Sequence, residues 1–316
     1  MYTNNKKYIH LITGGAGFIG SNLTNYLLKN NQKVICIDDF TSGSITNIQS
    51  WINNPDFTFI EDDITKDIDI KSDKIWHLAC PASPKKYNLN QLKTLKTGFI
   101  GTLNMLNLAK KYNSKFLLTS SSEIYGKNYQ QPQRENNISS DSPFNQRSCY
   151  IESKRISETL CFQYKNYVDL KVARIFNTYG PNMLENDGRV ISNFISKALN
   201  NKNLTIYGSG NQTRSFCYID DLIIGLIKLM NSDYDSPINL GNNKEITIKD
   251  LANIVIKKTK NTKNILFKKA IENEPFRRCP EIKNALNELN WQPKIDLDTG
   301  LNLTIEFYKK NFSKKL

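Results

Sequence analysis

The chain has 316 residues, a formal net charge of +13 and an apolar fraction of 39%, which is enough to build a core and excludes wholesale disorder. The basic residues are scattered in pairs such as Lys110–Lys111, without a block or an aromatic-interleaved stripe, so no nucleic-acid partner is expected. No apolar run approaches the roughly 18 residues that a membrane-spanning helix needs. We therefore expect a cytoplasmic protein without a signal peptide or membrane anchor.

The cysteines indicate the same compartment. All six lie far apart, and no two form a CxxC pair. Disulfides are rare in reducing compartments, so we expect reduced and mostly buried thiols and no metal site.

The first half of the chain alternates short apolar runs with longer amphipathic stretches. Strands are predicted at Ile9–Thr13, Val34–Ile37, Phe57–Ile60, Lys74–Leu78, Phe116–Ser120 and Val172–Phe176, and helices at Ile19–Lys29 and Leu95–Tyr112. This alternation is typical of right-handed βαβ units around a parallel sheet. The predicted fold class is α/β, with a Rossmann-type doubly wound parallel sheet in residues 1–176.

The pattern changes after Asn177 to shorter, loop-separated segments. They include a helix at Val190–Asn200, a hairpin-like segment LTIYGSG from Leu204 to Gly210, and mixed segments up to ILFKKA. We assign residues 177–316 mainly to a smaller C-terminal α/β lobe, with later segments crossing back over the first sheet.

A glycine-rich turn follows the first predicted strand. Gly14, Gly17 and Gly20 let the backbone turn tightly and approach a pyrophosphate at a helix N-terminus. Asp38 ends the second strand, 18 residues after Gly20, where a carboxylate accepts hydrogen bonds from both ribose hydroxyls and repels a 2′-phosphate. The pattern therefore favours NAD over NADP, with Asp63 placed to reach the adenine edge. The alternative is a structural glycine turn with a helix-capping acid.

Two later stretches, TSSSEIYG from Thr119 and CYIESK from Cys149, carry the candidate chemistry. Tyr150 and Lys154 are four residues apart, so on a helix they share a face. A lysine ammonium close to a phenol favours the phenolate and lowers its pKa. The pair predicts a base that removes a proton from a sugar hydroxyl while hydride leaves for nicotinamide.

With this cofactor turn and the Tyr-Lys pair, the chain resembles the extended short-chain dehydrogenase/reductases that act on nucleotide sugars. Ser121-Ser122-Glu123 differs from the Asp-Glu pair of the dehydratases and resembles the UDP-glucuronate decarboxylases. The segments HLACPASP, LKTGFIGTLNMLNLAKK, RIFNTYGPNM, YGSGNQTRSF and RRCPEI resemble the same group. The resemblance implies conversion of UDP-glucuronate to UDP-xylose and carbon dioxide through a UDP-4-keto intermediate, with NAD regenerated in each turnover.

The resemblance also implies site residues. Ser121 joins Tyr150 and Lys154 in the redox triad. Glu123 stands beside C5 of the sugar, unless it only caps a helix. Arg278 acts near the carboxylate and in proton delivery, unless it only forms a surface ion pair.

The same resemblance, together with the chemistry of the side chains, implies two groups of binding residues. Cofactor contacts are expected from Gly14, Gly17, Phe18, Ile19, Gly20, Asp38, Asp39, Phe40, Ser42, Gly43, Asp63, Ile64, Leu78, Thr97, Thr119, Tyr150, Lys154 and Thr178. Substrate contacts are expected from Pro84, Tyr87, Lys96, Ser122, Asn177, Arg189, Val190, Tyr207, Gln212, Arg214 and Arg278. Gln212 fits a turn equally well.

Two positions depart from the family pattern. Gly98 replaces an asparagine, which we expect to loosen the local helix and the cofactor packing. Ser44 replaces an arginine near the adenosine, with an expected loss of phosphate affinity.

Rival interpretations remain. The nearest is a UDP-sugar 4-epimerase or a 4,6-dehydratase, and a more distant one is a catalytically silent NAD-binding regulator. A homodimer is expected through the helices around Leu95–Tyr112 and Tyr150–Lys165, whose apolar residues include Leu103, Leu106, Leu108, Ile156, Leu160 and Phe162. The alternative is that these residues all face their own sheet.

Overall fold

The computed structural model describes residues 6–126, 130–137, 139, 141–145, 147–185, 187–270 and 275–313. The chain forms two compact units. Unit 1 contains residues 1–124, 142–174 and 226–238, and unit 2 contains residues 125–141, 175–225 and 239–316. Residues 226–238 lie in unit 1, and residues 125–141, within the predicted first lobe, lie in unit 2.

A seven-stranded sheet has the order β11-β6-β5-β4-β1-β2-β3. Its strands are β1 Ile9–Thr13, β2 Lys33–Asp38, β3 Phe57–Glu61, β4 Lys74–His77, β5 Lys115–Ser121, β6 Leu170–Ile175 and β11 Ile238–Leu240. The β1–β2, β2–β3, β1–β4 and β4–β5 pairs are all parallel. The winding direction changes between β1 and β4, and open α/β sheets bind ligands outside the carboxyl ends of the strands at such a point. The predicted doubly wound sheet is confirmed.

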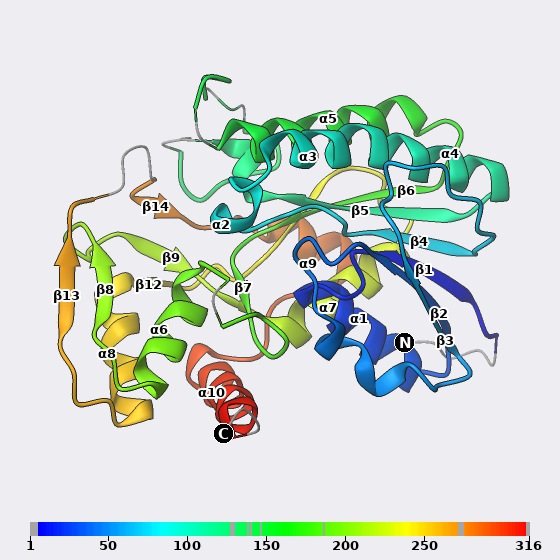
Figure 1. Ribbon diagram of the computed structural model, residues 1–316. Helices are drawn as coiled ribbons and strands as arrows, with labels where there is room; N and C mark the ends of the chain where they lie inside the picture. The colour runs from blue at the N-terminus through cyan, green and yellow to red at the C-terminus, as the bar shows by residue number, and fades with distance from the viewer. Residues whose placement is uncertain are drawn as a thin grey trace. The chain divides into compact units, whose positions relative to one another are not determined.

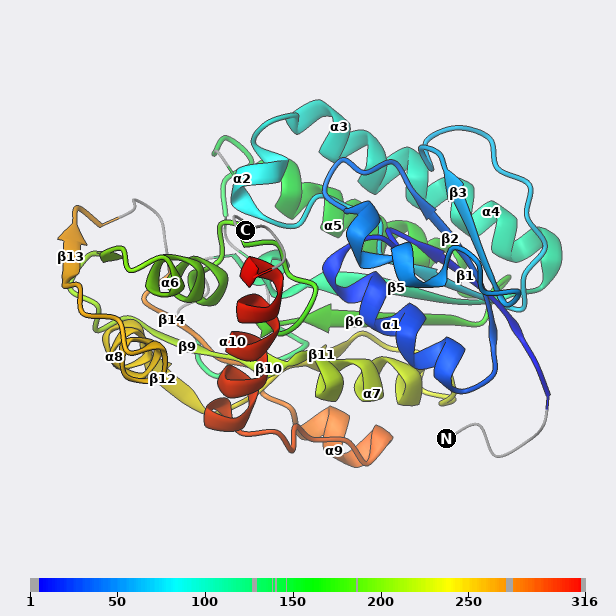
Figure 2. The same cartoon turned by 60° about the horizontal axis from the view of Figure 1, so that its bottom comes forward.

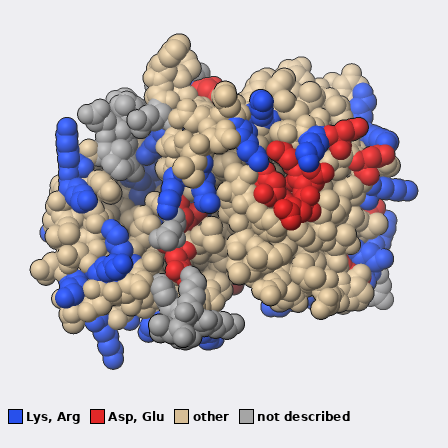
Figure 3. All heavy atoms as spheres, viewed as in Figure 1, with Lys and Arg blue, Asp and Glu red and all other residues tan. Residues whose placement is uncertain are grey.

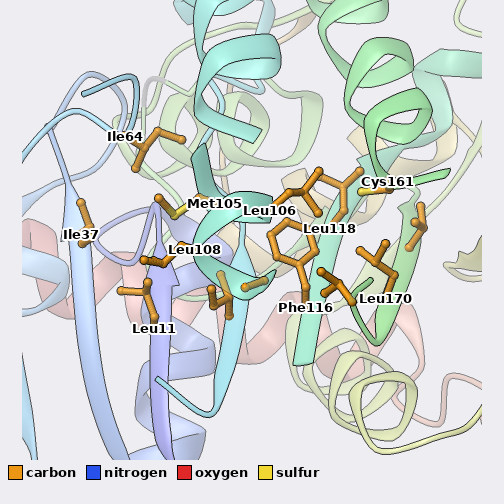
Figure 4. Close-up of a cluster of buried hydrophobic side chains, with 14 residues drawn as sticks. Leu11, Ile37, Ile64, Met105, Leu106, Leu108, Phe116, Leu118, Cys161 and Leu170 are labelled. Carbon is orange, nitrogen blue, oxygen red and sulfur yellow. The ribbon is translucent and has the colours of Figure 1, made fainter. Parts of the chain in front are cut away.

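Helices cover both faces of the sheet in unit 1, with α3, α4 and α5 on one side and α1 on the other (Figure 1). Their bounds are α1 Phe18–Lys29, α2 Pro84–Tyr87, α3 Gln91–Lys96, α4 Thr102–Tyr112 and α5 Ser148–Tyr164, with short turns η1 Ile45–Asn47, η2 Gln49–Trp51, η3 Thr97–Gly101 and η4 Ser122–Tyr125. Side chains of α4, α5 and the strands form one buried apolar cluster, including Met105, Phe116 and Cys161 (Figure 4).

Unit 2 consists of short strands and helices. The strands are β7 Thr178–Tyr179, β8 Leu204–Tyr207, β9 Thr213–Ser215, β10 Cys217–Tyr218, β12 Glu245–Thr247, β13 Ile265–Lys268 and β14 Arg277–Arg278. The helices are α6 Val190–Leu199, α8 Ile248–Thr259, α9 Lys283–Leu289 and α10 Leu297–Ser313, while α7 Ile219–Met230 runs across the boundary between the units. Helices α6, α8 and α10 pack together (Figures 1 and 2).

The hairpin expected at Leu204–Gly210 is wrong. β8 pairs in parallel with β13, whose residues follow 61 positions later, with Leu204 opposite Ile265. Gly208 and Gly210 do turn the chain with positive φ angles of 77° and 82°, but the next strand, β9, pairs with β12 and β14. The turn signal was therefore correct, while the pairing depends on contacts distant in sequence.

Two surface properties bear on the expected partners. Among the described residues, no helix is long and apolar enough to cross a membrane. Lys and Arg side chains are scattered over the face shown in Figure 3, without a continuous stripe, and acidic side chains gather in a compact patch.

The predicted helix Leu95–Tyr112 is interrupted by η3, a π-helical turn. At its second residue, Gly98, an added Cβ would lie 2.5 Å from the Cβ of Ser153 and 2.8 Å from its Cα. Helix α5 therefore approaches η3 as closely as a glycine allows. Gly98 therefore does not loosen the contact with α5, since the missing side chain is what lets the two helices meet. The expected effect on cofactor packing stays a prediction.

We predict that Gly98→Ala lowers thermal stability by about 1–3 kcal/mol, because overpacking outweighs the gain in helix propensity. Adding Ser153→Gly removes the nearest clash and is expected to recover part of the loss, in a double-mutant cycle of melting temperatures. Additive effects of the two changes would contradict the contact.

Candidate active site

The glycine turn forms at the carboxyl end of β1. Gly14 has a φ of 73° and donates its N–H to Ile37 O at 2.8 Å, while Gly17 is the N-cap of α1. A Cβ on Gly20 would lie 2.2 Å from Gly14 O, so this helix position requires glycine. The turn keeps backbone amides and the helix N-terminus free of side chains, as a pyrophosphate site requires. Phe18 and Ile19, half-buried, begin α1 behind it.

Asp38 lies beside this turn at the end of β2. Its carboxylate accepts from Ala16 N at 3.0 Å and from Phe40 N at 2.9 Å, and the residue is 8% exposed. Burial raises the pKa of Asp38 to about 6, against the opposing effect of the two amide donors. A Cβ on Gly43 would lie 2.8 Å from this carboxylate, so the following loop closes over it.

Lys93 links two further acids of the cofactor group. Its ammonium lies 2.5 Å from Asp39 and 3.5 Å from Asp63. Asp63 also accepts from the backbone and hydroxyl of Thr65, both at 2.9 Å. Lys93 was not predicted, because it lies 30 residues or more from either acid and has no motif of its own.

The three expected redox residues lie on β5 and α5 within unit 1. Ser121, Tyr150 and Lys154 are 8%, 6% and 5% exposed. The Lys154 ammonium donates to Thr119 O at 2.7 Å and lies 6.0 Å from the centre of the Tyr150 ring. The lysine is therefore held against the end of β5 with its charge next to the phenol.

Tyr150 is fixed by an aromatic neighbour. Tyr87, at the end of α2, stacks on it with ring centroids 5.2 Å apart and an angle of 6°. Pro84 begins the same short helix. Cys149 and Cys80 belong to this cluster, which limits the rotation of the phenol.

Glu123 lies in η4, directly after β5. Its backbone N–H donates to Ser121 Oγ at 3.2 Å, and its carboxylate lies 3.8 Å from the guanidinium of Arg147. Both side chains are only about one quarter exposed or less. Arg147 was not predicted, although it lies only three residues before Tyr150. Ser122 is buried beside Glu123.

Unit 2 brings two predicted arginines together. Arg278 on β14 is the register partner of Arg214 on β9 in a parallel pair, and each residue is 7% exposed. Arg214 donates to Thr213 O at 2.7 Å and to Phe276 O at 3.2 Å. The surface ion pair considered for Arg278 belongs instead to Arg277, which is 48% exposed and binds Glu245. Two buried arginines at paired positions of neighbouring strands suit an anionic ligand.

The other expected substrate contacts of unit 2 lie on several elements. Arg189 is the N-cap of α6, 3.4 Å from Asp187, and Val190 is the first residue of that helix. Tyr207 ends β8 and is 45% exposed. Gln212 donates to Tyr207 O at 2.7 Å, which supports its role as a turn residue. Asn177 follows β6. The expected cofactor residue Thr178 begins β7, and its Oγ1 donates to Phe176 O.

Several predicted residues are placed less directly. Thr119 and Thr97 are buried, and Ile64 belongs to the apolar core at 4% exposure. Ser42 and Leu78 are half-buried. Lys96 lines a groove of about 540 Å³ on the outer faces of α3, η3 and α5, with Glu152 and Arg155, and not the cluster around Tyr150. Ser44, the second departure, bonds Thr46 at the start of η1.

The described residues contain no cluster of three or more His, Cys, Asp or Glu side chains able to hold a metal ion.

Comparison with known proteins places this site in a family. Residues 11–304 match the family described as GDP-mannose 4,6 dehydratase. The chain belongs to this group of extended short-chain dehydrogenase/reductases. It is 46% identical to UDP-glucuronic acid decarboxylase 1 of Danio rerio over 302 residues, covering 95% of this chain and 72% of the relative. It is also 46% identical to UDP-glucuronic acid decarboxylase 6 of Arabidopsis thaliana, with 95% and 88% covered.

A solved structure is similar over nearly the whole chain. The UDP-glucuronic acid 4-epimerase of Bacillus cereus, in complex with UDP-glucuronic acid and NAD, has a TM-score of 0.85 and 29% identity, covering 96% of this chain and 99% of the other. The resemblance to the UDP-glucuronate decarboxylases is thus confirmed, and the fold is shared with an NAD-bound enzyme.

Proposed function

We propose that this chain is an enzyme that decarboxylates UDP-glucuronate to UDP-xylose and carbon dioxide. The observation that carries the proposal is that Ser121, Tyr150 and Lys154 are all buried on β5 and α5, which pack against each other. The Lys154 ammonium binds Thr119 O, and Glu123 stands at the end of β5 where a dehydratase has an Asp-Glu pair. Relatives at 46% identity carry the decarboxylase name, which supports the choice of substrate.

NAD is the proposed cofactor. The turn at Gly14–Gly20 would hold its pyrophosphate, since glycines there let the backbone approach a dinucleotide, and the Asp38 carboxylate beside the turn would bind its adenosine ribose. When bound, NAD would supply the acceptor and later the donor of the hydride at C4. Lys154 is placed to hold the nicotinamide ribose and to favour the Tyr150 phenolate.

The chain's own residues account for the remaining steps. Tyr150 removes the proton of the C4 hydroxyl, and Ser121 donates a hydrogen bond to the resulting C4 oxygen. A ketone at C4 makes the C5 carboxylate a β-keto acid, which loses carbon dioxide to give an enolate. Ser121 and protonated Tyr150 stabilise the enolate oxygen until C5 receives a proton.

Groups near C5 and the diphosphate complete the proposal. Arg147 holds the Glu123 carboxylate, which we assign to the C5 side of the sugar. Arg214 is assigned to the diphosphate, and its neighbour Arg278 to the departing carboxylate and the proton that replaces it. Because the two arginines are adjacent, a diphosphate contact by Arg278 is the competing role.

We further propose a homodimer, with a revised interface. Leu106 and Leu108 lie in the core of unit 1, and Leu160 packs against it, so these residues face their own sheet. The groove of α3, η3 and α5 instead presents Leu95, Phe99 and Ile156 with charges of both signs around them. A surface that combines apolar and oppositely charged residues can be self-complementary about a two-fold axis. A cytoplasmic location remains part of the proposal, supported by six cysteines that form no disulfide.

The primary test is incubation of the purified chain with UDP-glucuronate and NAD. We expect carbon dioxide and UDP-xylose from the parent, and a rate lower by about 10²–10⁴-fold for Tyr150→Phe, which lacks the base. Formation of UDP-galacturonate without carbon dioxide would identify a 4-epimerase instead.

A second prediction concerns pH. Ionised Asp38 accepts both ribose hydroxyls, and protonation near pH 6 removes that charge, so NAD affinity should fall about tenfold between pH 8 and pH 5. Asp38→Asn is expected to bind NAD weakly at both pH values in calorimetry.

The same carboxyl affects folding stability. Because the pKa of Asp38 in the folded state lies above the unfolded value of about 3.9, its ionisation lowers the free energy of unfolding as pH rises from about 4 to 6. The full loss of stability is present above pH 6.

A third prediction separates Arg278 from its neighbour. In a single turnover, Arg278→Ala should accumulate bound NADH and 4-keto sugar while UDP-xylose formation falls about 100-fold or more. Arg277→Ala, which removes only a surface ion pair, is the matched control and should retain the parent rate. A change in KM alone for Arg278→Ala would assign it to the diphosphate.

A fourth prediction tests the interface. Phe99→Glu places a charge in the groove and should convert a dimer of about twice 36.3 kDa to a monomer in light scattering. Leu286→Glu, at a residue of similar exposure on α9, should remain dimeric. A parent protein that is monomeric at micromolar concentration would exclude the proposal.

A further inference from the structure

His77 is a buried histidine near the proposed redox residues. The proposed mechanism gives His77 no role. It ends β4 and is 2% exposed. Its Nδ1 lies 2.8 Å from Thr13 Oγ1 and its Nε2 lies 3.0 Å from Thr102 Oγ1. Burial and then the charge of Lys154 lower the pKa of His77 to about 3, so the ring is neutral and carries one proton.

The hydrogen bonds of His77 continue from Thr102 to Ser157, and the Ser157 end of this series fixes which ring nitrogen carries the proton. Ser157 Oγ lies 2.8 Å from Gly98 O and 2.7 Å from Ser153 O. Carbonyl oxygens only accept, so the single Ser157 hydroxyl proton points to one of them. Ser157 must then accept from Thr102 Oγ1, 3.0 Å away.

The remaining protons follow in order. Thr102 has given its proton to Ser157, so it accepts from His77 Nε2–H. The unprotonated Nδ1 accepts from Thr13 Oγ1–H, and Thr13 accepts from Ala79 N–H at 3.3 Å. Each of the three hydroxyls donates one hydrogen bond. All donors in the series therefore point the same way, from Thr13 on β1 to Ser157 on α5. Only the Nε2–H tautomer of His77 satisfies this arrangement.

Two routes lead from His77 to Lys154. The side-chain route ends on Ser157 and Ser153, the turn of α5 that carries Lys154. The backbone route passes through Thr119, whose Oγ1 donates to His77 O at 3.1 Å and whose carbonyl accepts from the Lys154 ammonium at 2.7 Å. His77 is thus linked both to the turn of α5 that carries Lys154 and to the Thr119 carbonyl that binds the Lys154 ammonium.

We propose that His77, as the Nε2–H tautomer, is a positioning residue that fixes the Lys154 ammonium relative to the Tyr150 phenol through Thr102 and Ser157. This role rests on the proposed use of Tyr150 and Lys154 as the redox pair. A shift of the lysine weakens its support of the phenolate, so the effect appears in the pH dependence of the chemical step and not in substrate affinity.

Two amide substitutions distinguish the hydrogen bond at Nε2 of His77 from the one at Nδ1. His77→Gln places an N–H near the position of Nε2 and preserves the donor to Thr102. His77→Asn reaches only the position of Nδ1 and disconnects Thr102. For His77→Gln we expect a kcat within about threefold of the parent value. For His77→Asn we expect a kcat about tenfold lower at neutral pH and an unchanged KM. The acid limb of its kcat–pH profile should move to higher pH. Ser157→Ala should behave like His77→Asn.

The control is the only other histidine of the sequence, His10 on β1 of the same sheet. It is also buried, bonds Trp76 Nε1–H at 2.9 Å, and has a pKa lowered to about 3, by burial and then by Lys74. His10→Asn should lower the melting temperature but leave the pH profile in place. Equal profiles for His77→Gln and His77→Asn, or an equal shift in His10→Asn, would overturn the proposal.

A measurement without substrate separates this inference from the proposed reaction. The ultraviolet phenolate titration of the parent minus that of Tyr150→Phe reports Tyr150 alone. His77→Asn should move this titration to higher pH, whether or not UDP-glucuronate is the substrate. An unmoved titration would refute the positioning role, and a parent that fails to release carbon dioxide while the titration moves would refute only the proposed reaction.

Discussion

A lysine ammonium removed from water is the constraint on which the centre of unit 1 depends. Lys154 is 5% exposed, and a buried charge is stable only where hydrogen-bond acceptors replace the lost water. The carbonyl of Thr119 supplies one such acceptor, at the edge of a strand that cannot move without disturbing the sheet. His77 is neutral first because it is buried, and then because the Lys154 charge makes a second cation nearby unfavourable; both effects lower the pKa of His77.

Much of the fold could be predicted because its signals are local. The runs at Ile9–Thr13 and Phe57–Ile60 alternate with amphipathic helices, and β1 begins and ends as predicted. The glycine turn was also evident, since Gly14 and Gly20 must be glycine for reasons of backbone geometry alone. The proximity of Tyr150 and Lys154 was predictable because the two residues are one turn apart on α5.

What could not be predicted depends on contacts between distant segments. No local pattern pairs β8 with β13, joins Lys93 to Asp39, or sets Arg214 beside Arg278. The buried or exposed state of neighbouring residues is equally hidden, as Arg277 and Arg278 differ only in the side of β14 on which they lie.

The contact between Gly98 and Ser153 has an evolutionary consequence. Residues 98 and 153 lie so close together that a side chain at one position is tolerated only where the other residue is glycine. Relatives that carry asparagine at the position of Gly98 should therefore have glycine facing it, and each single exchange would pass through an overpacked intermediate. The two sites are expected to change together or not at all during divergence of the family.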